Sequence, residues 1–322
     1  MKKKVIAGLI LSALLVYLSV RGIDFRGVVE GFRSIRYAYV PPVIALLFLM
    51  QLLRSVRWGM ILSPLSKIDQ LSLFSVTSVG FLAITAIPAR LGELARPYLI
   101  TKKSDLKMSS ALGTIIVERV LDSLALLVIA GFVLLFMPMP PWLVRASLLF
   151  LLITLLLVVA MILMIIRREA SLRLLAPMIG KLPARYAERV DRLIGHFIEG
   201  FRIMIDPKLL ICVAGMSILI WLINAMAIHL LFSALGLQVP VMAAFVLMLV
   251  LIIGIAIPTA PGFIGNWHYF CILGLSLFGV PRTEALTFAI VFHALSIGQV
   301  IVLGVAFLPF NPFSVADLRR QT

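Results

Sequence analysis

Residues 71–100 read LSLFSVTSVGFLAITAIPARLGELARPYLI. The stretch is apolar as far as Ala86, and Pro88 and Gly92 then interrupt it as predicted hinges. Proline has no backbone N–H, and a broken backbone persists inside a bilayer only where protein or a polar cavity satisfies its polar groups. We therefore expect residues 71–100 to form a re-entrant helical hairpin that enters and leaves a membrane on its cytoplasmic side.

The composition of the whole chain supports a membrane location. Hydrophobic residues make up 62% of its 322 residues and charged residues 13%, about half the charged fraction of roughly 25% in soluble domains. Apolar segments long enough to span a bilayer lie at about 5–20, 38–53, 110–136, 144–166, 208–236 and 285–309. The predicted fold is an all-α, polytopic membrane helix bundle, with residues 1–322 as one integral membrane domain.

A second apolar stretch, residues 241–280, is broken in the same way as the first. Its break also begins with Ala-Ile-Pro, and its predicted hinges are Pro258, Pro261, Gly262 and Gly265. Half-helix ends at such a break present free backbone N–H groups to an anion. Asn266, directly after the break, is therefore a candidate substrate contact.

The order span, hairpin, span occurs twice, at about 38–136 and about 208–309. The charge distribution makes the two hairpins enter from opposite sides, which predicts an inverted pseudo-repeat of the kind found in secondary transporters. Chance similarity of the short Ala-Ile-Pro match is the alternative. Between the halves, about 167–207 forms a cytoplasmic amphipathic connector, and its residues 184–206 predict a helix that lies on the membrane or against the bundle.

The basic residues indicate how the bundle is oriented. The chain has a formal net charge of +15, and most of its 29 Lys and Arg fall between apolar segments, where they meet anionic lipid head groups rather than nucleic acid. The positive-inside rule predicts an inner or plasma membrane protein with both termini in the cytoplasm. Lys2, Lys3 and Lys4 before the first apolar run favour a retained span over a cleaved signal peptide.

Motifs for cofactors, metals and catalysis are absent from the sequence. Cys212 and Cys271 are isolated within apolar segments and predict neither a disulfide framework nor a metal cluster. The sequence contains no Walker loop, no G-x-S-x-G and no H-E-x-x-H. We therefore expect no cofactor, no metal and no catalytic residue, and membrane lipids as partners.

The first hairpin carries charges that suit a phosphate group. Arg90, Glu93 and Arg96 lie within or directly after its break. Guanidinium groups bind phosphate with two parallel hydrogen bonds and stay charged at any relevant pH. We expect these three residues to bind an anionic head group. The alternative is that Glu93 only neutralises Arg90 or Arg96 at the interface.

A second group of charges lies inside the predicted span 110–136. Glu118 and Asp122 share one helical face, and Arg119 can pair with Asp122 at i, i+3. Three ionisable groups in one turn are costly in lipid and should face protein or a cavity. They predict a substrate or proton site coupled to the hairpin arginines, with a buried salt-bridge lock between helices as the alternative.

Basic and aromatic residues also follow the predicted span 38–53. Arg54, Arg57 and Trp58 stand there, and such residues commonly anchor a span at the membrane surface. We therefore favour interfacial anchoring over head-group binding for these residues. His293, a lone histidine within a span, is expected to be packed or hydrogen-bonded rather than a ligand.

The chain resembles the lysylphosphatidylglycerol synthase transmembrane-region family of flippase-like integral membrane proteins. Nearly the whole chain is similar, most specifically at Pro88 to Glu93 with Arg96, at Glu118, Arg119 and Asp122, and at Pro258 to Gly265. The resemblance implies a multi-span bundle with inverted hairpins. In the multidomain synthases the similar region moves an aminoacylated phospholipid between leaflets. Their cytosolic aminoacyl-transferase domain has no counterpart here, so we expect no lipid aminoacylation by this chain alone.

One departure from the family pattern lies in the second hairpin. The family motif often reads Pro-x-x-Gly-Gly-x-Gly followed by a glutamate, whereas Asn266, Trp267 and His268 follow Gly265 here. Because the carboxylate is missing, the substrate and its coupling need not be the same as in the synthases.

The resemblance and the charges together predict a transporter or flippase for an anionic or phosphate-bearing lipid, including isoprenoid-linked lipids. Arg90 and Arg96 would hold the phosphate, and Glu118, Arg119 and Asp122 would shape the site. The alternative is a non-transporting membrane component of a lipid pathway, such as hopanoid or glycolipid synthesis, that supports a biosynthetic enzyme. A membrane-embedded transferase ranks third.

Overall fold

The chain forms an α-helical bundle in a computed structural model that describes residues 2–87, 92–166, 184–257 and 259–313. Within these residues, five helical segments are long and apolar enough to cross a membrane, and a bent pair makes a sixth candidate. The five contain α3 (Val40–Leu62), α6 (Met108–Phe136), α7 (Pro141–Ile166), α10 (Pro207–Ala234) and α13 (Arg282–Phe307), and the bent pair is α1 (Lys2–Val20) with α2 (Phe25–Arg33).

The predicted spans are confirmed as helices, with two differences at their ends. The chain bends by 81° between α1 and α2, so the pair that contains the first predicted span is a broken span or a re-entrant loop. α3 continues to Leu62, because Trp58, Ile61 and Leu62 are buried against the bundle and extend the helix. Arg54 and Arg57 consequently lie inside α3 rather than beyond its end.

Aspartates set the start of several helices. Asp24, Asp69 and Asp206 have extended backbones and accept hydrogen bonds from the first turns of α2, α4 (Gln70–Ala86) and α10. A side-chain oxygen at this position satisfies N–H groups that have no partner within the helix. The Asp69 carboxylate accepts a hydrogen bond from the Ser72 N–H at 2.8 Å. This bond lowers the pKa of Asp69.

The first predicted hairpin is formed by α4 and α5 (Ala95–Thr101), which pack against each other. α4 ends at Ala86 because the backbone of Ile87 turns to an extended conformation, with φ −95° and ψ 122°. Gly92 then passes so close to α4 that an added Cβ would overlap the Ala83 carbonyl. The return of the chain along α4 therefore depends on a glycine at this position.

The second hairpin is formed by α11 (Met242–Ala256) and α12 (Asn266–Ser276), joined through the short η4 turn (Pro261–Phe263). α11 ends at an extended Ile257, with φ −75° and ψ 122°, as α4 ends at Ile87. Gly262 and Gly265 have φ values of +70° and +93°, which residues with side chains rarely adopt. Both broken stretches are thus helical hairpins, while their entry from opposite sides of a membrane stays a prediction.

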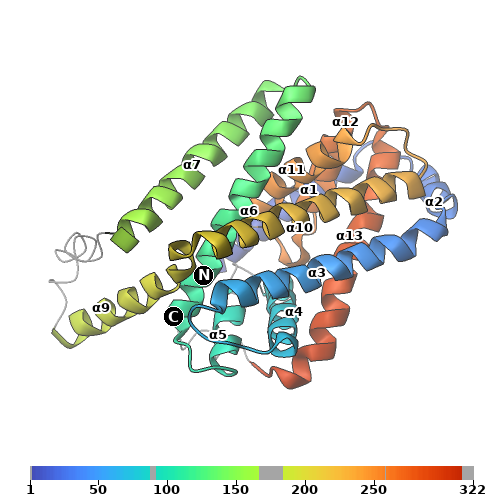
Figure 1. Cartoon of the computed structure of the whole chain (residues 1–322). Coiled ribbons are helices and arrows are strands. Elements are labelled where there is room, and N and C mark those ends of the chain that lie inside the picture. The colour runs from blue at the N-terminus through green and yellow to red at the C-terminus, as the bar shows by residue number, and fades with distance from the viewer. Residues whose placement is uncertain (1, 88–91, 167–183, 258, 314–322) are drawn as a thin grey trace.

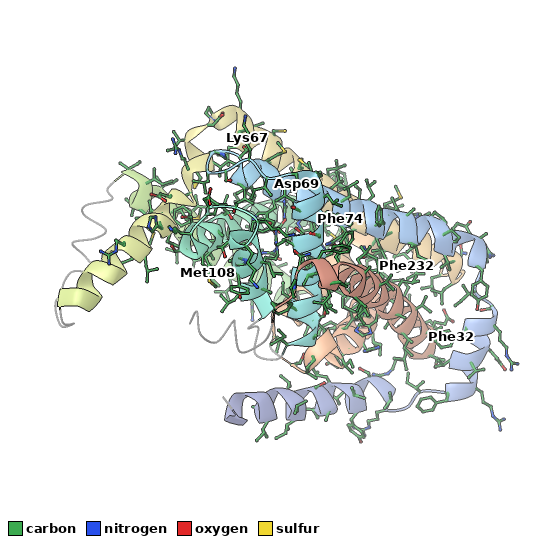
Figure 2. All side chains as sticks on the ribbon, turned by 90° about the horizontal axis from the view of Figure 1, so that it is seen from below. Phe32, Lys67, Asp69, Phe74, Met108 and Phe232 are labelled. Atoms are coloured by element: carbon green, nitrogen blue, oxygen red, sulfur yellow. The ribbon has the colours of Figure 1, made fainter. Side chains whose placement is uncertain are left out.

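The bundle is apolar on both its inside and its outside. Its largest buried cluster joins residues of α3, α10, α11, α12 and α13, and Phe232 lies within it (Figure 2). On α7, large hydrophobic side chains such as Leu148, Leu156 and Ile166 are exposed, and α7 stands out from the bundle beside α6 (Figure 1). An apolar helix with this exposure requires lipid as its solvent.

The described part of the amphipathic connector packs against the bundle. α9 (Ala184–Glu199) contacts α6, and Gly113 lies so close to Gly200 that a Cβ on either glycine would overlap the backbone of the other segment. Phe201, directly after this contact, is buried. The C-terminal end of α9 therefore packs against the bundle, while contact of this helix with a membrane surface stays a prediction.

Candidate functional site

Charged side chains from three helices meet inside the bundle. Arg57 belongs to α3, Arg96 to α5, and Glu118, Arg119 and Asp122 to α6. Arg57 and Arg96 are 1% exposed and Glu118 is 0% exposed. Buried charges are costly unless they are paired and hydrogen-bonded. We call these five residues the arginine cluster. Their ion pairs and hydrogen bonds to one another therefore decide whether the buried charges are stabilised.

Arg96 and Glu118 form an ion pair with two parallel hydrogen bonds. Nη1 and Nη2 of Arg96 donate to the two carboxylate oxygens of Glu118, each at 2.9 Å. The guanidinium also lies 4.2 Å from the ring centroid of Trp58, whose π face attracts cations. Trp58 donates in turn from Nε1 to Thr114 Oγ1 at 3.2 Å. Gly80 of α4 leaves the space for Arg96, because an added Cβ there would overlap the arginine side chain.

Arg57 and Asp122 form the second pair. Arg57 donates from Nη1 and Nη2 to the two oxygens of Asp122, and Nη1 also donates to Ser217 Oγ at 2.8 Å. Trp221 donates from Nε1 to Asp122 Oδ1 at 3.2 Å. Since Ser217 and Trp221 lie on α10, this pair holds α3, α6 and α10 together.

Arg119 links the two pairs and is the accessible member of the arginine cluster. Its Nη2 donates to Glu118 Oε1 at 2.7 Å, and its Nη1 lies 3.8 Å from Asp122 Oδ2. The side chain is nevertheless 51% exposed. A guanidinium group has five N–H donors, so Arg119 keeps donors for a ligand at the rim of the cluster.

The region around the cluster has an excess of positive charge. Arg54, one turn before Arg57 on α3, interacts electrostatically with Asp122, and its guanidinium lies 5.1 Å from the ring centroid of Phe81. With Arg54 included, four arginines face two carboxylates among the residues that the structure describes. Positive charge in a poorly hydrated region favours an anionic ligand.

The structure brings together four of the predicted site residues, namely Arg96, Glu118, Arg119 and Asp122. The expected i, i+3 pairing of Arg119 with Asp122 is present. Glu93 is exposed, and the contacts that place the four residues together do not include it. Arg90 and the predicted hinges Pro88 and Pro258 lie outside the described residues.

Arg57 and Trp58 were expected at the membrane surface, and the structure corrects this interpretation. Both side chains are at most 1% exposed, and both hold members of the arginine cluster. The signal that could have located them is the apolar sequence after the two residues, ending in Ile61 and Leu62. A helix that continues past a charged residue places that residue within the span rather than at its end.

Asn266 holds the second hairpin together. Its Nδ2 donates to the carbonyl oxygens of Gly254 at 3.0 Å and Ile257 at 3.3 Å, and its Oδ1 accepts from the Trp267 N–H at 3.1 Å. The residue is 0% exposed. These contacts show that Asn266 stabilises the turn, and its role as a substrate contact stays a prediction.

Three further candidate ligands, His293, Cys212 and Cys271, lie among the described residues. His293 interacts through Nε2 with the Gly262 carbonyl at 2.7 Å, so it is hydrogen-bonded as expected. Cys212 and Cys271 are free thiols. Within the part of the chain that is described, no group of His, Cys, Asp and Glu is arranged to hold a metal ion.

These features define a polytopic α-helical membrane protein with a buried, cation-rich cluster next to a broken helical hairpin. The chain belongs to the lysylphosphatidylglycerol synthase TM region family, whose sequence profile matches residues 5–304. It is also similar to a UPF0104 membrane protein from Methanothermobacter thermautotrophicus, with 27% identity over 305 residues, which are 89% of this chain and 90% of that protein. No solved structure matches the chain significantly.

Proposed function

We propose that this protein binds the phosphate group of an anionic lipid at the arginine cluster and carries the lipid between the two leaflets of a membrane. The observation that supports this function most directly is the half-exposed guanidinium of Arg119 at the rim of a buried cluster. A phosphate accepts two parallel hydrogen bonds from a guanidinium group, and its charge would offset the excess of arginine. The family name refers to a phospholipid, which agrees with a lipid substrate.

The two buried ion pairs would keep the site formed when no lipid is bound. Glu118 and Asp122 orient the guanidinium groups of Arg96 and Arg57 through hydrogen bonds to both carboxylate oxygens. Donors that are already oriented lose little conformational entropy when a ligand binds. Arg119 is then the group that exchanges contacts with Glu118 for contacts with the phosphate.

The first hairpin is the part of the site that we expect to move. Arg96 lies on α5, a helix of seven residues beside the break, whereas Glu118 lies on α6, a continuous helix of 29 residues. Short elements next to a break absorb backbone changes more easily than long packed helices. The η4 turn of the second hairpin contacts α4 of the first. A movement of either hairpin would therefore displace the other.

A leaflet-transfer assay with liposomes tests this function. The purified protein is reconstituted with fluorescent phosphatidylglycerol, and an impermeant quencher reports how much lipid reaches the outer leaflet. We expect Arg119→Gln to slow transfer about ten- to a hundredfold, because a hydrogen bond to a charged group contributes about 1.5–3 kcal/mol. Arg145→Gln, which removes an exposed charge from α7, is the matched control and should transfer lipid at the normal rate.

Two outcomes count against the proposal. One is a wild-type protein that moves none of the anionic lipids tested. The other is an equal rate for Arg119→Gln and Arg145→Gln. Either result would leave the arginine cluster without a role in lipid transfer.

Full burial of Arg57 and Arg96 favours a second candidate, in which the cluster is a fixed lock in a non-transporting, non-catalytic component of a lipid pathway. In a lock the charged pair can be replaced by an uncharged pair of similar size. The double variant Arg96→Met with Glu118→Gln would then restore cellular function lost in either single variant. A transporter with this uncharged pair would stay inactive, because the first hairpin has lost its cation.

A further inference from the structure

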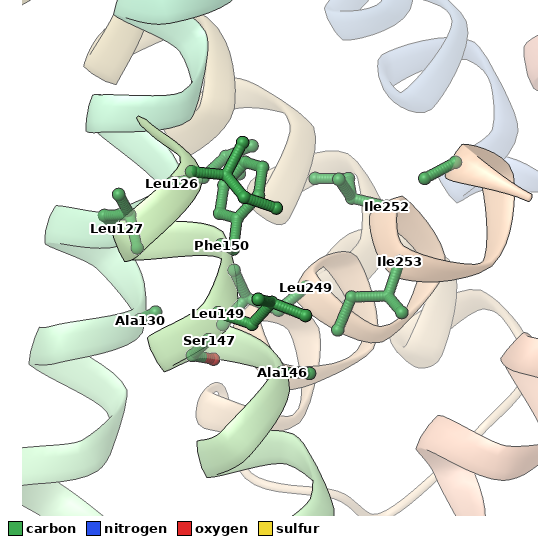
Figure 3. A pocket seen from close by; sticks show the side chains of 12 residues that line it. Leu126, Leu127, Ala130, Ala146, Ser147, Leu149, Phe150, Leu249, Ile252 and Ile253 are labelled. Atoms are coloured by element: carbon green, nitrogen blue, oxygen red, sulfur yellow. The ribbon is translucent and has the colours of Figure 1, made fainter. Parts of the chain in front are cut away.

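An apolar groove lies between α6, α7 and α11 (Figure 3). Its wall includes Leu126 and Ala130 from α6, Ala146 and Phe150 from α7, and Leu249 and Ile253 from α11. Of the described residues that line it, Ser147 alone is polar. The groove has a volume of about 240 Å³, and an apolar cavity of about 150 Å³ already holds a benzene molecule. A stretch of hydrocarbon chain therefore fits.

The groove and Arg119 lie on the same face of α6. Residues seven and eleven positions apart on an α-helix return to within about 20° of each other, so Arg119, Leu126 and Ala130 follow one another along one face. The seven residues from Arg119 to Leu126 correspond to about 10 Å along the helix axis. The exposed guanidinium of Arg119 thus stands at one end of a surface that becomes apolar two turns later.

We infer that this groove holds one hydrocarbon chain of the lipid whose phosphate group is bound at Arg119. The inference rests on the proposed function and adds that the substrate is recognised at both ends, by its charge and by its chain. The chemistry of the occupant follows from the two ends of the surface, since a cation needs an anion and an apolar wall needs hydrocarbon. An amphiphile whose charge and chain are about 10 Å apart matches this spacing.

Recognition of the chain must come from packing. Outside the groove the same chain lies in a bilayer that is equally apolar, so transfer into the groove gains little hydrophobic free energy. The gain comes from van der Waals contacts with three helices and from the tether, because a phosphate held at Arg119 raises the local concentration of its own chain. We therefore expect affinity to depend on the presence of a chain long enough to reach past Leu126.

Two substitutions on α7 separate the groove from the general membrane surface. Ala146→Phe places a ring in the groove. Leu148→Phe adds a ring to the same helix two residues later, where the side chain is 58% exposed, and leaves the groove open. Both variants keep every arginine of the cluster. Ile153→Trp, also in the groove wall, is the second filling variant if Ala146→Phe does not fold.

Binding is measured with purified protein in one detergent and three probes: glycerol 3-phosphate, short-chain phosphatidylglycerol and long-chain phosphatidylglycerol. We expect the wild-type protein and Leu148→Phe to bind the long-chain lipid about tenfold more tightly than the short-chain lipid. Ala146→Phe should lose this preference and bind glycerol 3-phosphate normally, which also shows that it is folded. A chain-length preference retained in both filling variants, or lost equally in Leu148→Phe, overturns the inference.

A fourth probe separates failure of the groove from failure of the proposed function. If no phosphate probe binds but Ala146→Phe weakens binding of long-chain diacylglycerol, the groove is a chain site and the proposed phosphate site is wrong. If phosphate probes bind through Arg119 and the filling variants change nothing, the phosphate site stands and the groove is wrong. Loss of glycerol 3-phosphate binding in Arg119→Gln, together with a chain-length preference in the wild-type protein that Ala146→Phe removes, supports both.

Discussion

Replacement of Arg57 by methionine tests the buried cluster directly. Methionine keeps a long side chain and removes the charge. Asp122 then loses the two hydrogen bonds that Arg57 donates to it, and Ser217 loses the one that it accepts from Arg57. Removing one member of a buried ion pair costs about 3–5 kcal/mol, because the other charge stays buried. Arg119, with Nη1 at 3.8 Å from Asp122, replaces part of the interaction. We therefore expect a loss of about 3 kcal/mol in the free energy of unfolding.

Unfolding in mixed micelles with increasing mole fraction of SDS, followed by far-UV circular dichroism, measures this loss. Arg54→Met is the matched control, because Arg54 lies one turn earlier on α3 and stacks on Phe81. A cation–π contact contributes about 0.5–2 kcal/mol, with the larger values for desolvated cations. The control should therefore lose clearly less stability than Arg57→Met.

The double variant Arg57→Met with Asp122→Leu completes the test. It leaves neither charge of the pair buried, so it should be more stable than Arg57→Met alone. Losses below about 1 kcal/mol for both Arg57→Met and Arg54→Met would match two exposed surface arginines. That result would refute the reasoning that Arg57 is a buried structural member of the cluster.

Two further predictions concern α4. Gly80→Val should destabilise the protein by about 1–3 kcal/mol, the usual cost of overpacking, because its Cβ would overlap Arg96. The same SDS titration checks this, and Gly131→Val, where an added Cβ meets nothing within 4 Å, should be nearly neutral. Asp69→Ala should cost about 1 kcal/mol at neutral pH, the usual value of an N-cap. Since the bond from Ser72 lowers the pKa of Asp69, this contribution is present above the ordinary carboxyl pKa of about 4 and is lost as the pH falls below it. Unfolding of wild type and Asp69→Ala should therefore converge in acid, and a difference that stays constant with pH would contradict the assignment.

The long helices could be predicted because hydropathy is a local property. A run such as that of α7 must lie in lipid whatever its neighbours are, and the sequence segment 144–166 corresponds to Pro141–Ile166 in the structure. The burial of Arg57 could not be predicted in the same way. The apolar residues after Trp58 indicate that α3 continues, but the partner that stabilises the charge of Arg57 is a carboxylate from another helix, and the residues next to Arg57 carry no sign of Asp122.

The two hairpins were predictable as breaks but not as contacts. Proline and glycine interrupt a helix through their own covalent structure, so the ends of α4 and α11 follow from the sequence. Which contacts the residues after each break make depends on the side chains and carbonyl groups that the rest of the fold places next to them. Arg96 reaches Glu118 because Gly80 leaves space, whereas Asn266 meets the carbonyl groups of its own hairpin.

The sequence by itself determined that the chain is an α-helical membrane protein, where its helices break, and that Glu118, Arg119 and Asp122 form one charged turn. These properties arise from the hydropathy and backbone chemistry of residues close together in the chain. Only the tertiary structure decided that Arg57 completes the cluster and that Arg119 is its accessible member. The physical reason is that a buried charge is stabilised by partners from other helices, and helix packing selects those partners.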